Sequence, residues 1–400
     1  MKSREDYLCA KPRIFILLLM LSLSIALLIN YAYIPALPVI ARSLSSTNSE
    51  TVLTVTALFI GYGLSQLWFA PFSDSFGRRV ALFTGIGILL IGLLIAITTS
   101  SIEQLIAARF IQGLGIGSVS VLYRVMIRDY FSEESLGQAV SIIITFACLF
   151  PPIAPFLGGM LLEIVSWKIL FLILFFYALI GIIILKLYLP ETIKKENYKK
   201  LQLISVSKSY LILFRNKQFL MSTCSIIFSY GCLTIYIAVT PFIYQINFHL
   251  SPAIYGTFII IPSLFFAAGS KISSFFNKKG IEFKRIVIIG FIIIISSSLL
   301  VLFSGALDID NKWVLTLLIS IEAVGIALVY INATAEMLRS LTKAHSPGIA
   351  LSGTLQMLGS GLIIYIASFM HIDTVYALGI STVICGITGF LFSFTFNINK

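Results

Sequence analysis

The sequence predicts an all-α polytopic membrane protein, and its composition carries most of that prediction. Of the 400 residues, 58% are hydrophobic and only 11% are charged, whereas a soluble domain carries roughly a quarter charged residues. A membrane-spanning helix needs about 20 apolar residues, so the hydrophobic share is enough for roughly eleven or twelve such helices. This composition excludes a soluble enzyme, a disordered chain and a nucleic-acid-binding module.

Apolar runs separated by polar breaks predict twelve membrane spans. The runs are continuous, whereas the strands of a membrane barrel alternate between apolar and polar residues. The first run is longer than the apolar region of a signal peptide, and no small-x-small cleavage site follows it cleanly, so we expect a retained first span. The expected limits are 14–40, 52–72, 79–99, 102–124, 138–162, 168–189, 219–242, 253–275, 285–306, 313–338, 348–369 and 373–396.

Positive charge falls almost entirely on one side of this arrangement. The net charge of +11 would suggest nucleic acid in a soluble protein, but here it is better explained as loop charge that orients the spans, and no nucleic-acid partner is expected. With a cytoplasmic N-terminus, 24 of the 28 Lys and Arg residues lie on the cytoplasmic side, and only Arg42, Lys168 and Lys312 lie opposite. Because cytoplasmic loops are enriched in Lys and Arg, we expect both termini in the cytoplasm.

The longest polar stretch, residues 190–218, divides the chain into two halves of six spans. We expect a six-helix bundle in residues 1–189, a cytoplasmic linker, and a second six-helix bundle in residues 219–400. Two such bundles around a central site are typical of a transporter. The plainer alternative for the linker is a solvated segment that only tethers the bundles. One pair of bundles encloses its own cavity, so we expect a monomer.

Two ionisable residues lie deep inside predicted spans, where charge is costly and therefore suggests function. Arg109 lies in the fourth span near Gln112 and Gly113, and we expect these residues to form the polar centre of the first half. The alternative for Arg109 is a cation held by backbone carbonyls that joins two helices. Glu322 lies in the tenth span, where a carboxyl can bind and release a proton. Its alternative is a carboxyl that faces a wet cavity without a role in transport.

Aromatic and amide side chains gather in three spans and suggest a binding cavity. Aromatic rings can hold lipophilic ligands by stacking and can attract a cation to the ring face. Each ring taken singly is also consistent with packing or with an aromatic belt at the membrane surface. The predicted cavity residues are Asn30, Tyr31, Tyr230, Tyr236, Tyr330 and Asn332.

Motifs for enzymatic chemistry are lacking in the sequence. The five Cys have no Cys-x-x-Cys spacing, and no His-Glu-x-x-His or strand-associated Gly-x-Gly-x-x-Gly occurs. We therefore expect no catalytic residues, no metal and no cofactor, and we disfavour an intramembrane enzyme, a receptor or an ATP-driven pump. The expected partners are a small-molecule substrate, protons and the lipid bilayer.

Three motifs resemble those of the major facilitator superfamily, a resemblance that spans nearly the whole chain. It implies the twelve-helix fold of that superfamily, with two six-helix bundles that rock about a central cavity. The second-span loop resembles its signature, and the fifth span resembles the motif of its drug–proton antiporters. The motifs are Gly63-x-x-Gln66 with Pro71-x-Ser73-Asp74-x-x-Gly77-Arg78-Arg79, then Arg109-x-x-Gln112-Gly113, and Pro151-x-x-Ala154-Pro155-x-x-Gly158-Gly159.

The signature loop resembles a cytoplasmic gate made by Asp74, Gly77, Arg78 and Arg79. A carboxylate at this turn can pair with a helix N-terminus or a nearby Arg, and glycine permits the tight turn. The loop departs from the family pattern at Ser75, where Arg is usual, and this weakens the gate. In the fifth span, proline and glycine let helices approach closely and bend, which is also a purely structural explanation of that motif.

Other motifs resemble the bicyclomycin/chloramphenicol-resistance group of bacterial drug–proton antiporters. They are Tyr33-Ile34-Pro35-Ala36-Leu37-Pro38, Arg124-x-x-x-Arg128-Asp129 and Tyr236-Ile237-x-x-x-Pro241-Phe242-x-x-Gln245. The resemblance implies a drug or metabolite exporter of the bacterial inner membrane. Relatives in this group carry an Asp where this chain has Tyr31. That departure leaves two hypotheses: an exporter in which Glu322 carries the proton, or an importer or facilitator of one metabolite without proton coupling.

Overall fold

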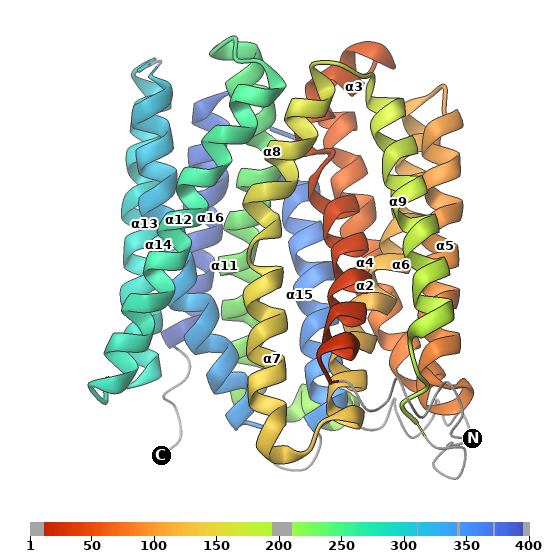
Figure 1. Cartoon of the computed structure of the whole chain (residues 1–400). Helices are drawn as coiled ribbons and strands as arrows, with labels where there is room; N and C mark the ends of the chain where they lie inside the picture. Colours follow the sequence, from red (N-terminus) through yellow and green to blue (C-terminus); the bar gives the residue numbers. More distant parts are fainter. Residues whose placement is uncertain (1–11, 194–209, 310, 342–344, 371–372, 395–400) are drawn as a thin grey trace, which may run out of the picture.

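The computed structural model describes residues 12–193, 210–309, 311–341, 345–370 and 373–394, and all regular structure in these ranges is helical (Figure 1). Twelve helices within them are long and apolar enough to cross a membrane, as the sequence predicts. The first half contains α2 (Pro12–Tyr31), η1 (Ile34–Ala36), α3 (Leu37–Ser43), α4 (Asn48–Phe76), α5 (Arg78–Thr98), α6 (Ile102–Tyr130), α7 (Glu133–Ala147), α8 (Phe150–Leu162) and α9 (Trp167–Tyr188). The second half contains α11 (Lys217–Phe242), η3 (Ile243–Asn247), α12 (Pro252–Lys278), α13 (Phe283–Ala306), α14 (Lys312–Arg339), α15 (His345–Ala367) and α16 (Val375–Phe394).

Prolines interrupt three of the twelve spans. The first span changes from α2 to the short η1 and α3, where Pro35 and Pro38 occupy early helical positions. The fifth span breaks between α7 and α8, just before Pro151 and Pro152. The seventh span passes from α11 into the single π-helical turn η3 soon after Pro241. Proline lacks a backbone N–H, so each interruption frees carbonyl groups close to the space between the halves.

Two helices of the first half extend beyond their predicted ends. Helix α4 begins at a capping box between Thr47 and Glu50 and continues to Phe76. Helix α6 continues to Tyr130, so Arg124 and Arg128 lie on a helix rather than in a loop. The sequence prediction ended the fourth span at residue 124 and counted both arginines as cytoplasmic charge.

We call the side of the bundle where α2 begins and α16 ends the near side, and the opposite side the far side (Figure 1). Apart from α8 and α15, the helices of each half pack mainly on helices of the same half. The two halves meet along α4 and α15 and along α8 and α12. Of the predicted linker, residues 194–209 lie outside the described residues.

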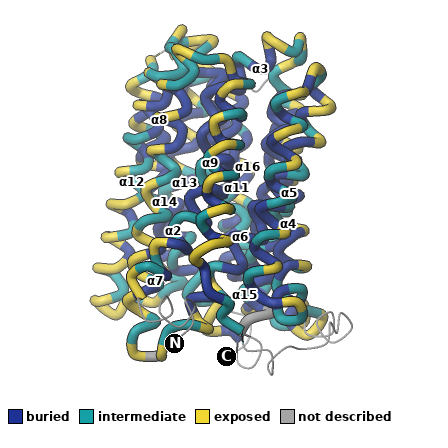
Figure 2. Tube along the Cα trace, turned by 45° about the vertical axis from the view of Figure 1, so that its right-hand side comes forward, coloured by how far each residue is buried: buried dark blue, intermediate teal, exposed yellow. Residues whose placement is uncertain are grey.

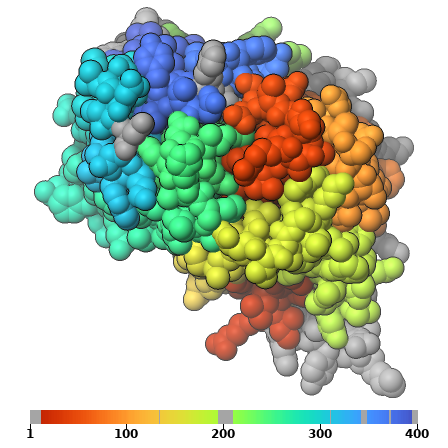
Figure 3. All heavy atoms as spheres, turned by 90° about the horizontal axis from the view of Figure 1, so that it is seen from above, coloured from red at the N-terminus to blue at the C-terminus, as the bar shows by residue number. Residues whose placement is uncertain are grey.

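The halves make close contacts on the far side. Gly159 of α8 lies so close to the carbonyl of Pro252 that a Cβ would clash with it. The side chain of Gln245 donates to the carbonyl of Pro35 at 2.9 Å, and the Ala253 N–H donates to Glu163 at 3.3 Å. Seen from above, α8 and α12 abut on this side (Figure 3).

The near side is more open around the fifth span. Most residues of α7 are exposed or half-buried, whereas most of those in α6 are buried (Figure 2). Along α4 and α15, the halves remain in contact as far as Gln66, which lies against Gly353. Beyond that contact a space separates the halves on the near side, where Ala70 faces Ile349 and Ala350.

Candidate functional site

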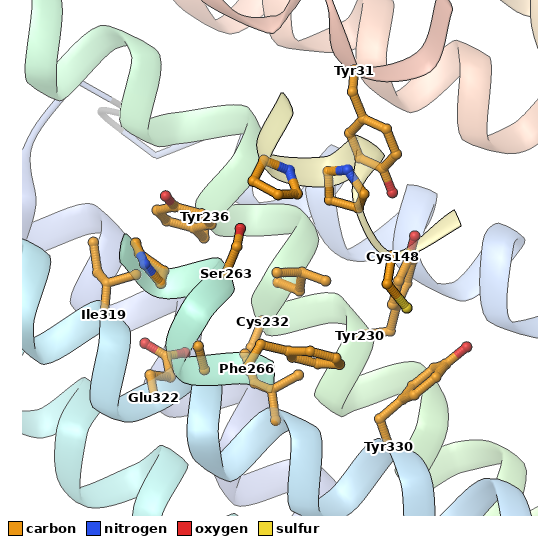
Figure 4. A pocket seen from close by; sticks show the side chains of 16 residues that line it. Tyr31, Cys148, Tyr230, Cys232, Tyr236, Ser263, Phe266, Ile319, Glu322 and Tyr330 are labelled. Atoms are coloured by element: carbon orange, nitrogen blue, oxygen red, sulfur yellow. The ribbon is translucent and has the colours of Figure 1, made fainter. Parts of the chain in front are cut away.

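A cavity of about 200 Å³ lies between the two halves (Figure 4). Its walls come from α2, the α7–α8 break, α11, α12 and α14. The break in the fifth span brings Cys148, Pro151 and Pro152 to the wall. Four tyrosines and one phenylalanine give it an aromatic character: Tyr31, Tyr230, Tyr236, Phe266 and Tyr330.

Three of these tyrosines form a group that crosses between the halves. Tyr31, from α2, and Tyr230, from α11, both line the cavity and lie close to each other. The ring centroids of Tyr230 and Tyr330 are 5.9 Å apart, and those of Phe59 and Tyr230 are 6.4 Å apart. Such offset and tilted pairs are favourable and still leave ring faces free for a flat ligand.

Glu322 supplies a carboxyl group to the cavity wall. Its residue is only 5% exposed, and within the described residues its Oε1 atom has no hydrogen-bond partner. It is the acidic residue among those described that line this cavity. In Figure 4 it lies on the side of the cavity that carries Ile319, away from Tyr31 and Tyr330. A carboxyl on the cavity wall can bind a proton or form a hydrogen bond with a polar group of a ligand.

Arg109 forms a sealed polar centre inside the first half. The residue is fully buried, and its Nη1 donates to the Ile29 carbonyl at 3.2 Å and to Gln112 Oε1 at 2.5 Å. Its guanidinium lies 3.7 Å from the ring centroid of Tyr33, and Gln112 in turn donates to the Gly92 carbonyl at 3.0 Å. These contacts join α2, α5 and α6, and Arg109 is not among the residues that line the cavity. Its Nε and Nη2 atoms are buried without a hydrogen-bond partner within the described residues.

The other residues proposed from the sequence lie around the cavity rather than on its wall. Asn332 is fully buried, donating to Ser273 at 2.8 Å and accepting from Asn277 at 3.0 Å, and so it joins α12 to α14. Asn30 is buried on α2 beside Tyr31. Gly113 lies against the Leu58 carbonyl, where a Cβ would clash, and thus permits close packing of α6 on α4.

The predicted gate residues form a compact charge cluster on the near side. The buried guanidinium of Arg78 pairs with Asp74 at 2.5 Å and with Asp129 at 2.9 Å. Gly77 has φ 100°, a conformation that glycine adopts without strain. The carboxylate of Glu191 accepts from the backbone N–H groups of Arg78 and of the next residue, Arg79, at 3.0 and 3.1 Å. The described ion pairs of Asp74 and Arg78 all lie within the first half.

The antiporter-like motif lies on α8 and serves two surfaces. Pro151 reaches the cavity wall, whereas Ala154 and Pro155 are buried in the bundle. Gly158 lies against the carbonyl of Ala32, and Gly159 lies against that of Pro252 in the second half. The motif therefore combines a helix break at the cavity with close packing on the far side.

A second cavity, of about 160 Å³, lies closer to the near side between α4, α6 and α15. Two arginines one helical turn apart, Arg124 and Arg128, line it together with Gln66. The sequence analysis did not propose this site, because it treated both arginines as cytoplasmic charge and as part of a family-like motif only. Their spacing of four residues, directly after an apolar helix, is the signal that places them on one helix face.

A twelve-helix bundle with a cavity between two halves defines an integral membrane transport protein. The model of the Major Facilitator Superfamily matches residues 19–364, and the chain belongs to this superfamily. The superfamily consists of transporters rather than enzymes, so a small-molecule substrate and a membrane environment follow. The resemblance inferred from the sequence motifs is thereby confirmed.

Bacterial drug-resistance proteins are among the relatives. Multidrug resistance protein D of Escherichia coli is 26% identical over 374 residues, which cover 93% of each chain. A bicyclomycin resistance protein homolog of Haemophilus influenzae is 29% identical, and the uncharacterized MFS-type transporter YdgK of Bacillus subtilis is 30% identical. The chain spans 53% and 60% of the length of these two relatives.

Solved structures give the same fold at low sequence identity. The xylose transporter XylE of E. coli, in a partially occluded inward open conformation, matches with a TM-score of 0.72 at 15% identity. The match covers 96% of this chain and 98% of that chain. It supports the twelve-helix, two-bundle fold predicted from the sequence.

Proposed function

We propose that the chain exports drugs or small lipophilic metabolites from the bacterial cytoplasm across the inner membrane, in exchange for protons. The cavity carries this proposal, because it combines tyrosine rings from both halves with one carboxyl, that of Glu322. Rocking of the halves would expose the cavity alternately to either side. The chain works as a monomer in this scheme, and the positive charge of the near side, with both termini, faces the cytoplasm.

Glu322 is the proposed proton carrier, because its Oε1 atom has no partner within the described residues and it lies where a ligand would bind. A proton and a substrate would then compete for one wall of the cavity. Asp74, Gly77, Arg78 and Arg79 are proposed as the cytoplasmic gate. Their charge cluster lies within the first half here, and closure of the near side would bring it against the second half.

Inverted bacterial membrane vesicles with a fluorescent reporter of internal pH test the proposal. After the vesicles are energised, a panel of neutral lipophilic drugs, lipophilic ions and labelled metabolites is added. We expect at least one compound to release protons from the vesicles, and Glu322→Gln to abolish that release. Glu103→Gln, an exposed acid on the far-side end of α6, is the matched control and should keep it.

Two outcomes would contradict parts of the proposal. Proton release that is unchanged in Glu322→Gln would remove this residue from the coupling mechanism. Flux of a labelled solute that continues after the proton gradient is collapsed would favour the second candidate, an uncoupled importer or facilitator. The specific observation that favours this candidate is Tyr31, which occupies the position where related antiporters carry an acid.

A further inference from the structure

We propose that the transported compounds carry one anionic group on an apolar body, and that Arg124 binds that group. This inference rests on the proposed transport role and names the substrate class of the same site. It starts from the second cavity, where α6 presents Arg124 and Arg128 to the space between the halves.

Arg124 is available to a ligand. It is exposed to the cavity, and its Nε donates to the hydroxyl of Tyr123 at 3.1 Å. The guanidinium carbon lies 5.5 Å from the centroid of the Tyr123 ring. A guanidinium has five N–H donors in a planar fork that matches a carboxylate or a phosphate. Within the described part of the chain no carboxylate pairs with Arg124, so donors remain for an anion.

The nearby arginine Arg78 is occupied in a way that Arg124 is not. Arg78 is buried and pairs with both Asp74 and Asp129. Asp129 follows Arg128 directly in sequence, yet its carboxylate accepts from Arg78. The acid closest in sequence to the cavity arginines therefore pairs with the gate cluster rather than with Arg124.

Tyr330 lies between Arg124 of the second cavity and the tyrosine group of the first. Arg124 lies within electrostatic reach of the hydroxyls of Tyr62 and Tyr330. Tyr330 also lines the first cavity, where its ring packs near that of Tyr230. A compound whose anionic group binds Arg124 can thus place an apolar ring against the exposed faces of these tyrosines. A ligand bound in this way would contact both Arg124 and the tyrosines of the first cavity.

The same arrangement disfavours lipophilic cations. A cation that reached the tyrosines from the near side would pass two arginines on α6. Like charges in a narrow, poorly hydrated space repel more strongly than in water. Glu322 is the acid that lines the first cavity within the described residues, and it lies on the part of the wall away from Tyr330. Selection by charge therefore favours anions at the near side.

Equilibrium binding to the full chain in lipid nanodiscs tests this inference with three ligands that share one apolar body. Naphthylacetate, naphthylacetamide and naphthylethylammonium carry a negative, a neutral and a positive group. We expect naphthylacetate to bind with a Kd at least about tenfold lower than the ammonium compound. Arg124→Gln should weaken naphthylacetate about tenfold, as expected for loss of a charged hydrogen bond, and should change naphthylacetamide less than about twofold.

Two further variants keep the test interpretable. Arg124→Lys retains the charge without the planar fork and should keep part of the preference for the anion. Arg42→Gln removes an exposed arginine on α3, away from both cavities, and should leave all three affinities unchanged. Equal elution in size-exclusion chromatography establishes that each variant is folded.

Three results would overturn the inference: naphthylacetate affinity unaltered in Arg124→Gln, tightest binding by the ammonium compound, or no binding of naphthylacetate by the unaltered chain. The measurement uses no ion gradient, so it does not depend on the direction of transport or on proton exchange. Failure of the Glu322→Gln experiment would leave this inference standing, and failure here would leave export standing with another substrate class.

Discussion

The two halves of the molecule repeat one helix contact but fill its polar centre differently. In the first half, α5 and α6 meet at Gly85 and Gly115, where a Cβ on Gly115 would lie 2.6 Å from the Gly85 carbonyl oxygen. In the second half, α13 and α14 meet at Gly290 and Gly325, and the same distance is 2.7 Å. These glycine pairs define equivalent positions in the two bundles.

Counting back from the equivalent glycines aligns the polar residues. Gln112 and Glu322 each lie one turn before the glycine, and Arg109 and Ile319 lie one turn earlier still. In the first half, Gln112 binds Arg109 and the carbonyl of Gly92. In the second half, the preceding turn carries an aliphatic side chain, and Glu322 lines the cavity with one oxygen unpartnered within the described residues.

This difference shows that burial of an ionisable residue does not by itself indicate a role in transport. Both Arg109 and Glu322 are ionisable and almost fully inaccessible. The side chain on the neighbouring helical turn decides whether the polar group is enclosed by the protein or left facing the cavity. The comparison can be tested by substitutions at equivalent positions of the two halves.

The largest loss of stability is expected for Arg109→Met. The change removes the donor from the Ile29 carbonyl and from Gln112, leaving two buried acceptors without partners. Each such group costs about 1–3 kcal/mol, so we expect a loss of about 3 kcal/mol or more in the free energy of unfolding. Thermal unfolding of purified protein in detergent, followed by light scattering and tryptophan fluorescence, measures it.

Ile319→Met is the matched control for Arg109→Met, because it alters the equivalent position of the other half. An aliphatic exchange of similar volume costs less than about 1.5 kcal/mol. The comparison of the halves would fail if both variants lowered the unfolding midpoint equally. A full loss of folded protein in Arg109→Met alone would agree with it.

A smaller effect is expected at the repeated helix contact. Gly115→Ala and Gly325→Ala each place a methyl group against the backbone of the opposing glycine. Overpacking of this kind costs about 1–3 kcal/mol. The two variants should lose similar stability if the contacts are equivalent, as measured by the same unfolding midpoints.

Gly87→Ala separates this packing effect from helix propensity. Gly87 lies on α5, two residues after Gly85, and a Cβ on Gly87 would meet no atom within 4 Å. Alanine favours helix over glycine by up to about 1 kcal/mol, so this variant should be as stable as the unaltered chain or slightly more stable. Unequal losses at Gly115 and Gly325 would contradict the repeat.

The fold was predictable because lipid imposes a simple rule on the chain. Each span must satisfy its own backbone hydrogen bonds and present apolar side chains over about 20 residues, and both demands appear directly in the sequence. The breaks in the first and fifth spans are harder to predict. Pro35 and Pro151 indicate a disturbance, but whether a helix bends or stops there depends on the neighbouring helices that receive the freed carbonyl groups.

The site was predictable only in part, for a physical reason. Tyrosines stand out in apolar spans, and the structure brings Tyr31, Tyr230, Tyr236 and Tyr330 to one cavity. The positions of Arg124 and Asn332 depend on how far each helix continues and which face it turns inward. The spacing of Arg124 and Arg128 shows that they share a helix face, but which neighbouring helix that face meets depends on packing between distant segments.

Only a small change in stability is expected for Glu322→Gln, which gives the second half the amide that the first half has as Gln112. The substitution preserves the size of the side chain, and in the described residues no ion pair is lost with it. We therefore expect the free energy of unfolding to change by less than about 1 kcal/mol, while proton-coupled transport is lost. Unfolding midpoints and vesicle transport, measured on one preparation, separate the two effects. If Glu322→Gln instead destabilised the protein as much as Arg109→Met, Glu322 would be a structural residue like its counterpart, and the two halves would differ in sequence but not in the use of their polar centres.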